Sequence, residues 1–586
     1  MVEIRLGQGS EDDGQVRKVS AVEVPEHSGA EIPVGPGFPG TWDVAVPGVG
    51  EVTWEGFYTG PYRLDPGEID GICRALLGIG PEEVPDAAGR ELRPYVSDGS
   101  PVVSVVLHSA TPMLKSLEAD LDDTVNGRVA DDVATYVETR AVSLARPGDL
   151  VVGRTAPWRA AAALAAETDG VELVEVPGIE YYYLSHALLR LAAMEGERSP
   201  VLARLIDTVR TRPQTLVRLY AVDLEIQIFL LYLKRAAGVP ALRTDANSPE
   251  VGSYWNTKAP LHPTVTDAAA LSVADLAPYE VMRAEAAVAP LGRRLGVRCP
   301  VVPGYAIDGR RPDIEAVHAQ LVTAGRLFAE RYGIVRGCLK PSEGGAGARI
   351  VPGLDLTDPV TLARQAERVW RAQETFVLEA HVDYLDSPLA PGVFLSPSGH
   401  VRDGHLAPGL TLQLTNGTSW QGNVFFEEEY AGQVGLSAAA YRTVRDALAE
   451  LRDGFAGQDL SVVTAGFDFA VGRLGGRFGD EAQVVLQDPN LSSHGAEYLR
   501  FFRDRVLEKG GPGCAVTQVV DPALDLRALR ARTDGRPPWS EVISSIPGRW
   551  GMLAVAADSP REAAARMAAW HDAWTEAGLI RPAPRR

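Results

Sequence analysis

One stretch, residues 334–351 with the sequence IVRGCLKPSEGGAGARIV, constrains the fold of this chain more than any other. Its apolar first half favours a mostly buried strand that ends at Lys340, and its last residues begin a return strand. Between them lie Gly344, Gly345 and Gly347, which make a loop too flexible for a helix. Glycines let backbone N–H groups approach a polyphosphate closely, and the lysine adds a fixed positive charge. By itself the stretch leaves two interpretations open, a phosphate-binding loop and a hairpin with a loose turn.

The composition is that of a large globular protein. The 586 residues are too many for one hydrophobic core, so we expect roughly two to four domains. An excess of 77 acidic over 57 basic side chains gives a net charge of −20, which argues against binding to nucleic acid or to an anionic membrane. Four widely spaced cysteines without a CxxC pair indicate neither a disulfide framework nor a zinc site.

No segment has the pattern of a membrane span or a secretion signal. The N-terminus lacks the apolar core of a signal peptide. The longest apolar run, residues 224–233, contains Glu225 and Gln227 and is too short to cross a bilayer, so a buried helix is predicted there. A cytoplasmic, reduced protein is therefore expected.

The sequence divides into three regions. Residues 1–95 are rich in glycine, proline and acids, and residues 35–40 formally match GxGxxG. We reject that match because prolines fill two variable positions and no strand–turn–helix surrounds it. Residues 96–260 are predicted to form an α/β domain, and residues 261–586 a second module.

In the middle region, strands alternate with helices, which argues for a parallel sheet. The predicted strands are residues 102–107, 149–153, 171–176 and 241–244. A single long helix is predicted over residues 215–237, because this segment is densely apolar and Gly238 is placed to end it.

The last region mixes helices with antiparallel strands, as in an α+β module. Helices are predicted at residues 313–333, 359–373 and 437–455, and from Ser559 onward. Strands are predicted at residues 376–382, 465–473 and 482–490. A further strand pair is predicted to turn at Pro397-Ser398-Gly399.

Two carboxylates and an amide stand out on the last two strands. Asp468 lies in the segment GFDF, and Asp488 and Asn490 lie in VVLQDPN, each among apolar neighbours. A carboxylate in such surroundings is unfavourable unless something neutralises it. Magnesium prefers oxygen ligands and bridges phosphates, so the three side chains together predict a magnesium site. Taken singly, each would also fit an aspartate at a turn or an asparagine cap.

The order of these features resembles the ATP-grasp superfamily of carboxylate–amine ligases, including peptide ligases. A lysine ends a strand, a glycine loop follows, and then come an acidic hinge strand at residues 378–382, an Asp-Phe strand and an Asp-x-Asn segment. The resemblance covers residues 260–586, and the α/β region before it resembles a pre-ATP-grasp domain. It implies an α/β pre-ATP-grasp domain followed by an ATP-grasp module with nucleotide-binding and C-terminal subdomains.

The resemblance implies roles for the residues at matching positions. The residues that would contact ATP phosphates are Lys340 and the earlier lysine of some members, Lys258. The phosphate-covering loop would comprise Ser342, Gly344, Gly345 and Gly347. The hinge beside adenine would comprise Glu379, Ala380, His381 and Val382, with Asp383 or Asp386 at the ribose. The Mg²⁺ ligands would be Asp468, Asp488 and Asn490.

Two positions depart from the family pattern. Asp488 stands where the family often has glutamate, which shortens the reach to the metal by one methylene. Gly466 stands where many members have an arginine, two residues before the first metal aspartate. The group that would stabilise an acyl phosphate is therefore open among Arg500, Arg473 and Arg402.

The implied activity is ATP-dependent formation of an amide or peptide bond through an acyl phosphate, with release of ADP and phosphate. The expected partners are a small carboxylate and an amine, such as amino acids in specialised metabolism, and neither nucleic acid nor membrane; a homodimer is left open. Two alternatives remain: an ATP-grasp carboxylase or kinase-like enzyme, and a nucleotide-binding scaffold without turnover. The presence of Lys340 together with the three predicted metal ligands argues against the scaffold.

Overall fold

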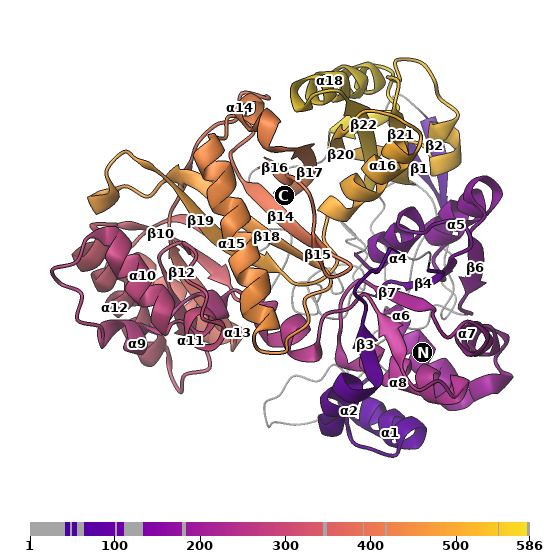
Figure 1. Ribbon diagram of the computed structural model, residues 1–586, viewed down its shortest axis with the longest axis horizontal. Coiled ribbons are helices and arrows are strands. Elements are labelled where there is room, and N and C mark those ends of the chain that lie inside the picture. The colour runs from indigo at the N-terminus through magenta and orange to yellow at the C-terminus, as the bar shows by residue number, and fades with distance from the viewer. Residues whose placement is uncertain are drawn as a thin grey trace.

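The computed structural model describes most of the chain (Figure 1). The described residues are 41–46, 50–55, 64–99, 102–109, 133–177, 183–343, 349–390, 392–416, 419–548 and 550–582. The three glycines of the predicted phosphate loop, Gly344, Gly345 and Gly347, lie outside these ranges, as does the rejected match at residues 35–40. Within the ranges, no helix is both long enough and apolar enough to cross a bilayer.

A six-stranded parallel sheet forms the N-terminal half, in the order β3-β8-β7-β4-β5-β6. Its strands are β3 (Leu92–Pro94), β4 (Ser104–Leu107), β5 (Leu150–Gly153), β6 (Glu172–Glu175), β7 (Leu216–Leu219) and β8 (Leu242–Thr244). The helices around it are α1 (Pro66–Leu77), α2 (Val84–Glu91), α4 (Val133–Ser143), α5 (Ala156–Asp169), α6 (Leu184–Met194), α7 (Pro200–Thr211) and α8 (Leu224–Ala237). Every residue of β4, β5 and β7 is buried, as expected at the centre of a parallel sheet. The predicted α/β class is confirmed.

The parallel half begins before residue 96. Leu64 and Ile69 share a hydrophobic core with Val105 of the sheet, and β3 pairs with β8 so that Leu92 lies opposite Leu242. The segment with α1, α2 and β3 is therefore structurally part of the α/β half, although its composition sets it apart in the sequence.

The prediction of one helix over residues 215–237 is wrong in its first part. Residues Leu216–Leu219 form β7, and the helix α8 starts only at Leu224. The side chain of Asp223 caps α8 by accepting a hydrogen bond from the Ile226 amide at 2.6 Å. A short apolar run that is buried on all sides carries no period, so the sequence pattern does not separate strand from helix there.

A four-stranded antiparallel sheet, in the order β11-β10-β12-β9, follows in the chain. Its strands are β9 (Gly304–Asp308), β10 (Arg336–Pro341), β11 (Val351–Asp355) and β12 (Thr375–Ala380). The smaller helices that precede this sheet are α9 (Val265–Ala269), α10 (Pro278–Val288) and α11 (Pro290–Leu295). Two long helices, α12 (Ile314–Tyr332) and α13 (Pro359–Ala372), pack into the same core. Asp313 caps the start of α12, and Gly333 ends it at φ 66°, both as the sequence predicts.

The third sheet has eleven strands and extends through the rest of the chain. Its main order is β13-β18-β14-β16-β17-β20-β22-β21, while β15, β19 and β23 pair with β14, β18 and β20. Its strands are β13 (Asp383–Tyr384), β14 (Pro397–Arg402), β15 (His405–Leu406), β16 (Leu410–Asn416), β17 (Ser419–Phe426), β18 (Ala465–Arg473), β19 (Ala482–Asn490), β20 (Cys514–Pro522), β21 (Ser540–Ile546), β22 (Trp550–Ala557) and β23 (Ile580–Pro582). The helices of this part are α14 (Ala431–Val434), α15 (Ala438–Ala456), α16 (Ala496–Glu508), α17 (Leu526–Arg530) and α18 (Pro560–Glu576). Its strand pairs are antiparallel, which confirms the α+β character predicted for this region.

The turn predicted at Pro397-Ser398-Gly399 is wrong. These residues begin β14, and the chain reverses later, at Asp403 and Gly404, whose φ angles are 50° and 80°. Positive φ at both central residues is the geometry of a tight hairpin turn, in which aspartate followed by glycine is favoured. The Pro-Ser-Gly sequence has turn propensity, but pairing with β18 on one side and β16 on the other overrides it.

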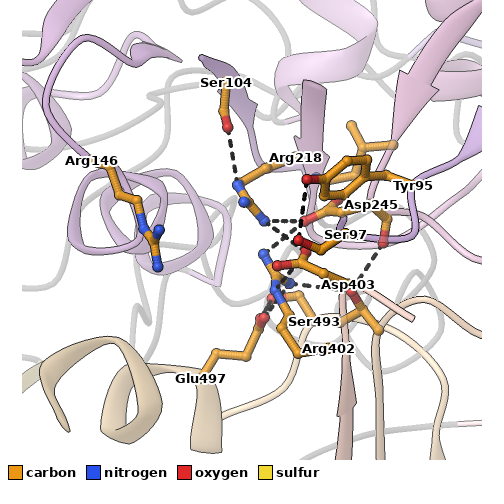
Figure 2. A network of polar contacts seen from close by, with 12 residues as sticks. Tyr95, Ser97, Ser104, Arg146, Arg218, Asp245, Arg402, Asp403, Ser493 and Glu497 are labelled. Carbon is orange, nitrogen blue, oxygen red and sulfur yellow. Dashed lines mark hydrogen bonds and ion pairs between the residues drawn. The ribbon is translucent and has the colours of Figure 1, made fainter. Parts of the chain in front are cut away.

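A buried cluster of charges joins the two halves of the protein (Figure 2). Glu497 of α16 contacts Arg140 of α4 at 3.0 Å, and it also forms an ion pair with Arg402 of β14. Arg402 in turn contacts Asp245, which follows β8, at 3.0 Å. Arg218 of β7 reaches the same aspartate at 3.5 Å and Asp403 at 3.3 Å.

Three arginines thus face three carboxylates in this interface network, which we define as Arg140, Arg218, Arg402, Asp245, Asp403 and Glu497. Burial by itself would raise the pKa of Glu497, but the two arginines beside it outweigh that effect and hold the pKa well below its usual range. Removing one partner from a buried ion pair leaves an uncompensated charge, which is far more harmful than never having the pair. The network therefore fixes β14 and α16 against the parallel half.

Replacing Glu497 with glutamine tests this role. The change leaves Arg140 and Arg402 buried without their shared carboxylate, so we expect the free energy of unfolding to fall by about 3–5 kcal/mol. Urea denaturation followed by tryptophan fluorescence measures this loss. The matched control is Glu508→Gln at the exposed end of the same helix, which should stay within about 0.5 kcal/mol of the wild type. Equal stability of the two variants would contradict the proposed role of the network.

Candidate functional site

The two predicted metal aspartates lie directly opposite each other. Asp468 of β18 pairs in register with Asp488 of β19, and a β-bulge follows at once between Asp468 and Phe469. The Asn490 side-chain amide donates to Asp468 Oδ2 at 2.8 Å, and the Ser398 hydroxyl donates to Asp468 Oδ1 at 2.5 Å. We call Asp468, Asp488 and Asn490 the acid corner. Side chains of directly opposite residues point to the same face of a sheet, so the register itself sets the two carboxylates side by side.

The acid corner is electrostatically unfavourable as it stands. Burial raises the pKa of Asp468 to about 6, and the neighbouring Asp488 adds to the rise, while hydrogen bonds from Ser398, Gln413 and Asn490 offset part of it. Burial also raises the pKa of Asp488, although the positive charges of two lysines work against that rise. Two adjacent carboxylates that resist ionisation are a site where added positive charge is strongly favoured.

Two lysines approach this corner from different parts of the chain. Lys258 Nζ lies 3.1 Å from Asp488 Oδ1. Lys340, at the end of β10, is buried and lies 2.6 Å from Glu379 Oε2, where burial would lower its pKa but Glu379 outweighs that effect and raises it. His262 contacts the other oxygen of Glu379 at 3.2 Å. Lys340 also lowers the pKa of Asp488, so the pairs Lys258–Asp488 and Lys340–Glu379 interact electrostatically with each other.

Lys258 is held beside the strand that carries Lys340. Its backbone amide donates to the Ser342 carbonyl at 3.0 Å, and the next amide, of Ala259, donates to the Ser342 hydroxyl at 2.9 Å. Ser342 is buried, and the described range that contains it ends one residue later, at Glu343. The structure therefore brings together two lysines that are 82 positions apart in the sequence (340 − 258).

The predicted adenine hinge runs along the end of β12. The Ala380 and His381 amides donate to backbone carbonyls of neighbouring segments at 2.8 and 3.1 Å, and Val382 is buried. Asp383 and Asp386 are both exposed. The Glu379 side chain, fully buried between Lys340 and His262, points into the protein and holds the lysine.

The acid corner offers the oxygen ligands that Mg²⁺ prefers, two carboxylates and one amide. Among the described residues, no group of three or more His, Cys, Asp and Glu side chains could hold a metal ion. The third protein ligand would therefore be the Asn490 amide oxygen, and water or phosphate oxygens would complete the shell, as is usual for Mg²⁺. The raised pKa of Asp468 supports the fit, because only neutral donors face this carboxylate.

Comparison with known proteins gives structural likeness only. No family profile matches the chain, and no curated protein matches it. Biotin carboxylase from Campylobacter jejuni matches at 10% identity over 81% of this chain and 92% of that chain, with a TM-score of 0.45. N5-carboxyaminoimidazole ribonucleotide synthetase from Thermus thermophilus matches at 14% identity over 74% and 96%, with a TM-score of 0.40.

D-alanyl-alanine synthetase A from Vibrio cholerae matches at 14% identity over 48% of this chain and 67% of that chain, with a TM-score of 0.29. Because every TM-score lies below 0.5, we rest the function proposed below on the residues of this chain.

The three candidate arginines differ sharply in their surroundings. Arg402 is buried in the interface network and faces three carboxylates. Arg473 is exposed at the far end of β18, and its Nε donates to the Asp480 carbonyl at 3.1 Å. Arg500 of α16 has a distant carboxylate, Asp504, at 3.9 Å, and lines a cavity. The structure does not bring Arg473 to the acid corner, and Arg402 is already matched in charge.

Several residues of the site were not predicted from the sequence. Ser398 and Gln413 both contribute to the hydrogen bonding of Asp468, and His262 contacts Glu379. Ser398 was missed because its segment was interpreted as a turn. The alternation of polar residues in SGHVR, at positions 398, 400 and 402, is the strand signal that would have found it.

The raised pKa of Asp468 predicts how the stability of the ligand-free protein depends on pH. The Asp468 carboxyl has a pKa of about 6 in the folded protein and near 3.9 in the unfolded chain. Its ionisation therefore lowers the free energy of unfolding by the full amount above pH 6, and this loss shrinks as the pH falls toward 3.9. Asp468→Asn should therefore raise the melting temperature by a few degrees at pH 8, by less at pH 5, and the gain should vanish near pH 4. Differential scanning fluorimetry across this range measures the effect.

Asp207→Asn, on an exposed position of α7, serves as the control and should change the melting temperature little at any pH. A gain for Asp468→Asn that is the same at pH 5 and pH 8 would show that ionisation of Asp468 is not its cause.

Proposed function

We propose that this chain is an ATP-dependent ligase that joins a small carboxylate to an amine, with ADP and phosphate as products. The observation that carries the proposal is the convergence of two lysines and two carboxylates from four separate segments. Lys258 contacts Asp488 at 3.1 Å, Asp488 lies opposite Asp468, and Lys340, near the end of β10, lies close enough to lower the pKa of Asp488. Cations for phosphates next to oxygen ligands for a divalent metal are what a site for a metal–nucleotide complex requires.

In the proposed reaction, a carboxylate oxygen attacks the γ-phosphorus of ATP, and ADP leaves. The amine nitrogen then attacks the carbonyl carbon of the acyl phosphate, loses a proton and displaces phosphate. Little covalent chemistry falls to the protein, so catalysis depends on positioning and on charge neutralisation. Lys340 and Lys258 would contact the phosphates and offset the negative charge that the γ-phosphoryl group carries.

Mg²⁺, held by Asp468, Asp488 and Asn490, would supply further positive charge to the phosphate oxygens. Lys258 has a second role in this proposal, because its ammonium group neutralises Asp488 in the absence of ligand. The hydrogen bonds from Ser398 and Asn490 keep the Asp468 carboxylate oriented within the corner.

The balance of products tests the reaction class. We expect ADP and phosphate to appear only when a carboxylate and an amine are supplied together, assayed by coupled detection of phosphate and mass spectrometry across amino acids and small acids. AMP and pyrophosphate in place of ADP would exclude an acyl phosphate. Turnover with bicarbonate and no amine would favour the carboxylase alternative.

The metal ligands give a sharper test. Asp468→Asn and Asp488→Asn preserve shape while each removes one charge from the corner, so turnover should fall roughly 100-fold or more, and the stabilisation by ATP with Mg²⁺ should shrink. Asn490→Ala should act in the same direction but more weakly, because it removes a neutral ligand. The control is again Asp207→Asn, which should keep full activity. Near-wild-type turnover in both aspartate variants would remove the metal site from the proposal.

A further inference from the structure

A cavity of about 200 Å³ lies between the sheet and α16, beside the acid corner. One part of its wall is polar and includes His400, Thr411 and Arg500 as well as the carboxylates Glu497 and Asp504. The other part is apolar, and its lining residues are Leu406, Ala407, Pro408, Phe425 and Leu499. This volume lies below the roughly 300–1,000 Å³ of sites for drug-sized ligands, which favours a ligand of amino-acid size over a nucleotide.

The cavity and the acid corner share one face of the sheet. Ser398, which donates to Asp468, and His400, which lines the cavity, are two residues apart on β14 and therefore point to the same side. Two residues along a strand span about 7 Å. The Thr411 hydroxyl contacts His400 Nε2 at 2.8 Å and continues the polar row onto β16. A ligand in the cavity would thus lie next to the acid corner.

Among the side chains that line the cavity, three buried nitrogens have no hydrogen-bond partner. Arg402 Nε lies 3.4 Å from Asp403 within the interface network, which leaves Arg500 Nε and His400 Nδ1. Buried polar groups in native proteins are almost always hydrogen-bonded, so each orphan atom needs an explanation. Both belong to side chains that line the same cavity. The two nitrogens have almost no exposed surface, so they mark His400 and Arg500 as incompletely hydrogen-bonded side chains of this wall.

Two carboxylates, Glu497 and Asp504, line the cavity, but neither lies within 3.5 Å of the Arg500 guanidinium. Arg402 at its edge is fully matched within the interface network, whereas the carboxylate paired with Arg500, Asp504, lies 3.9 Å away and is also approached by Arg146 at 4.0 Å. Burial, reinforced by the positive charge of Arg402, lowers the pKa of Arg500 to about 10, so the guanidinium is held charged in a place that disfavours it. A charged, planar guanidinium such as that of Arg500 can bind a carboxylate through two parallel hydrogen bonds.

Gly466 explains why the cavity reaches so close to the corner. The rings of His400 and His494 are stacked 4.5 Å apart at 16°, and a Cβ on Gly466 would come within 3.3 Å of His494 and 3.4 Å of His400. The missing side chain at Gly466, where the family pattern has an arginine, leaves room for this pair. We expect Arg500, which comes from α16, to supply the positive charge near Gly466 in place of that arginine.

We propose that this cavity binds the carboxylate substrate, a monocarboxylic acid with an apolar side group, and that Arg500 holds its carboxylate. The proposal rests on the ligase function above for the fate of the bound acid, but the binding itself requires no nucleotide. The apolar part of the acid lies against Leu406, Pro408 and Phe425, and its carboxylate lies toward His400 and the acid corner.

Saturation-transfer NMR on the full chain without nucleotide tests the proposal independently of turnover. The probes are aliphatic and aromatic amino acids together with butanoate, hexanoate and benzoate, each paired with its carboxamide. We expect signals from acids with an apolar group, and none from the matching amides. Arg500→Gln should weaken binding of the acids roughly 10- to 100-fold, and Arg500→Lys should restore part of it, because lysine keeps the charge but loses the planar fork.

Two further variants separate the cavity from general damage to α16. Ala407→Leu should fill the cavity and exclude hexanoate and benzoate more than butanoate. Arg505→Gln, on the same helix but paired with Glu541 at 2.9 Å outside the cavity, is the control and should bind like the wild type. Equal binding of acids and amides, unchanged binding in Arg500→Gln, or no binding of any probe by the wild type would overturn the proposal. Acid binding without ATP turnover would instead count against the ligase alone.

Discussion

Much of this protein depends on a buried set of charges that contains equal numbers of arginines and carboxylates. Arg140, Arg218 and Asp245 come from the parallel half, whereas Arg402 and Glu497 come from the antiparallel half. Each member alone would be strongly unfavourable in the interior, so displacing one half from the other would leave buried charges without partners. Hydrophobic contacts between the halves supply attraction, but they are not directional, whereas this network specifies geometry.

The network matters for the site because both share β14. Arg402 ends this strand in the network, while Ser398, four residues earlier, donates to Asp468 in the acid corner. A shift of the parallel half would therefore move β14, and with it the hydrogen bond from Ser398 to Asp468, a proposed metal ligand. The same face of β14 also carries His400, so the corner and the neighbouring cavity are held by one rigid element.

The elements with a clear period or a cap were predictable from the sequence, as for α12 between Asp313 and Gly333 and for β18 and β19, whose bounds the structure reproduces. Lys340 and the acid corner were predictable as candidates, because charged groups among apolar strand residues need a reason. The split of residues 215–237 and the course of β14 were not, since burial on all sides and local turn propensity hide the strand period. The interface network could not be predicted, because nothing local to Arg140 or Arg402 reveals partners 357 and 157 positions away (497 − 140 and 402 − 245).

Lys340 is already engaged in the protein before any ligand binds. Its ammonium group lies 2.6 Å from a fully buried glutamate, and Glu379 has His262 as a second partner that stays when the lysine moves. A ligand with a single negative charge gains little by exchanging one anion near the lysine for another. A polyanion gains much more, because several of its oxygens can share the lysine while Glu379 keeps its histidine. In the proposed nucleotide site, the pair would therefore act as a charge threshold that favours a triphosphate over singly charged anions at Lys340.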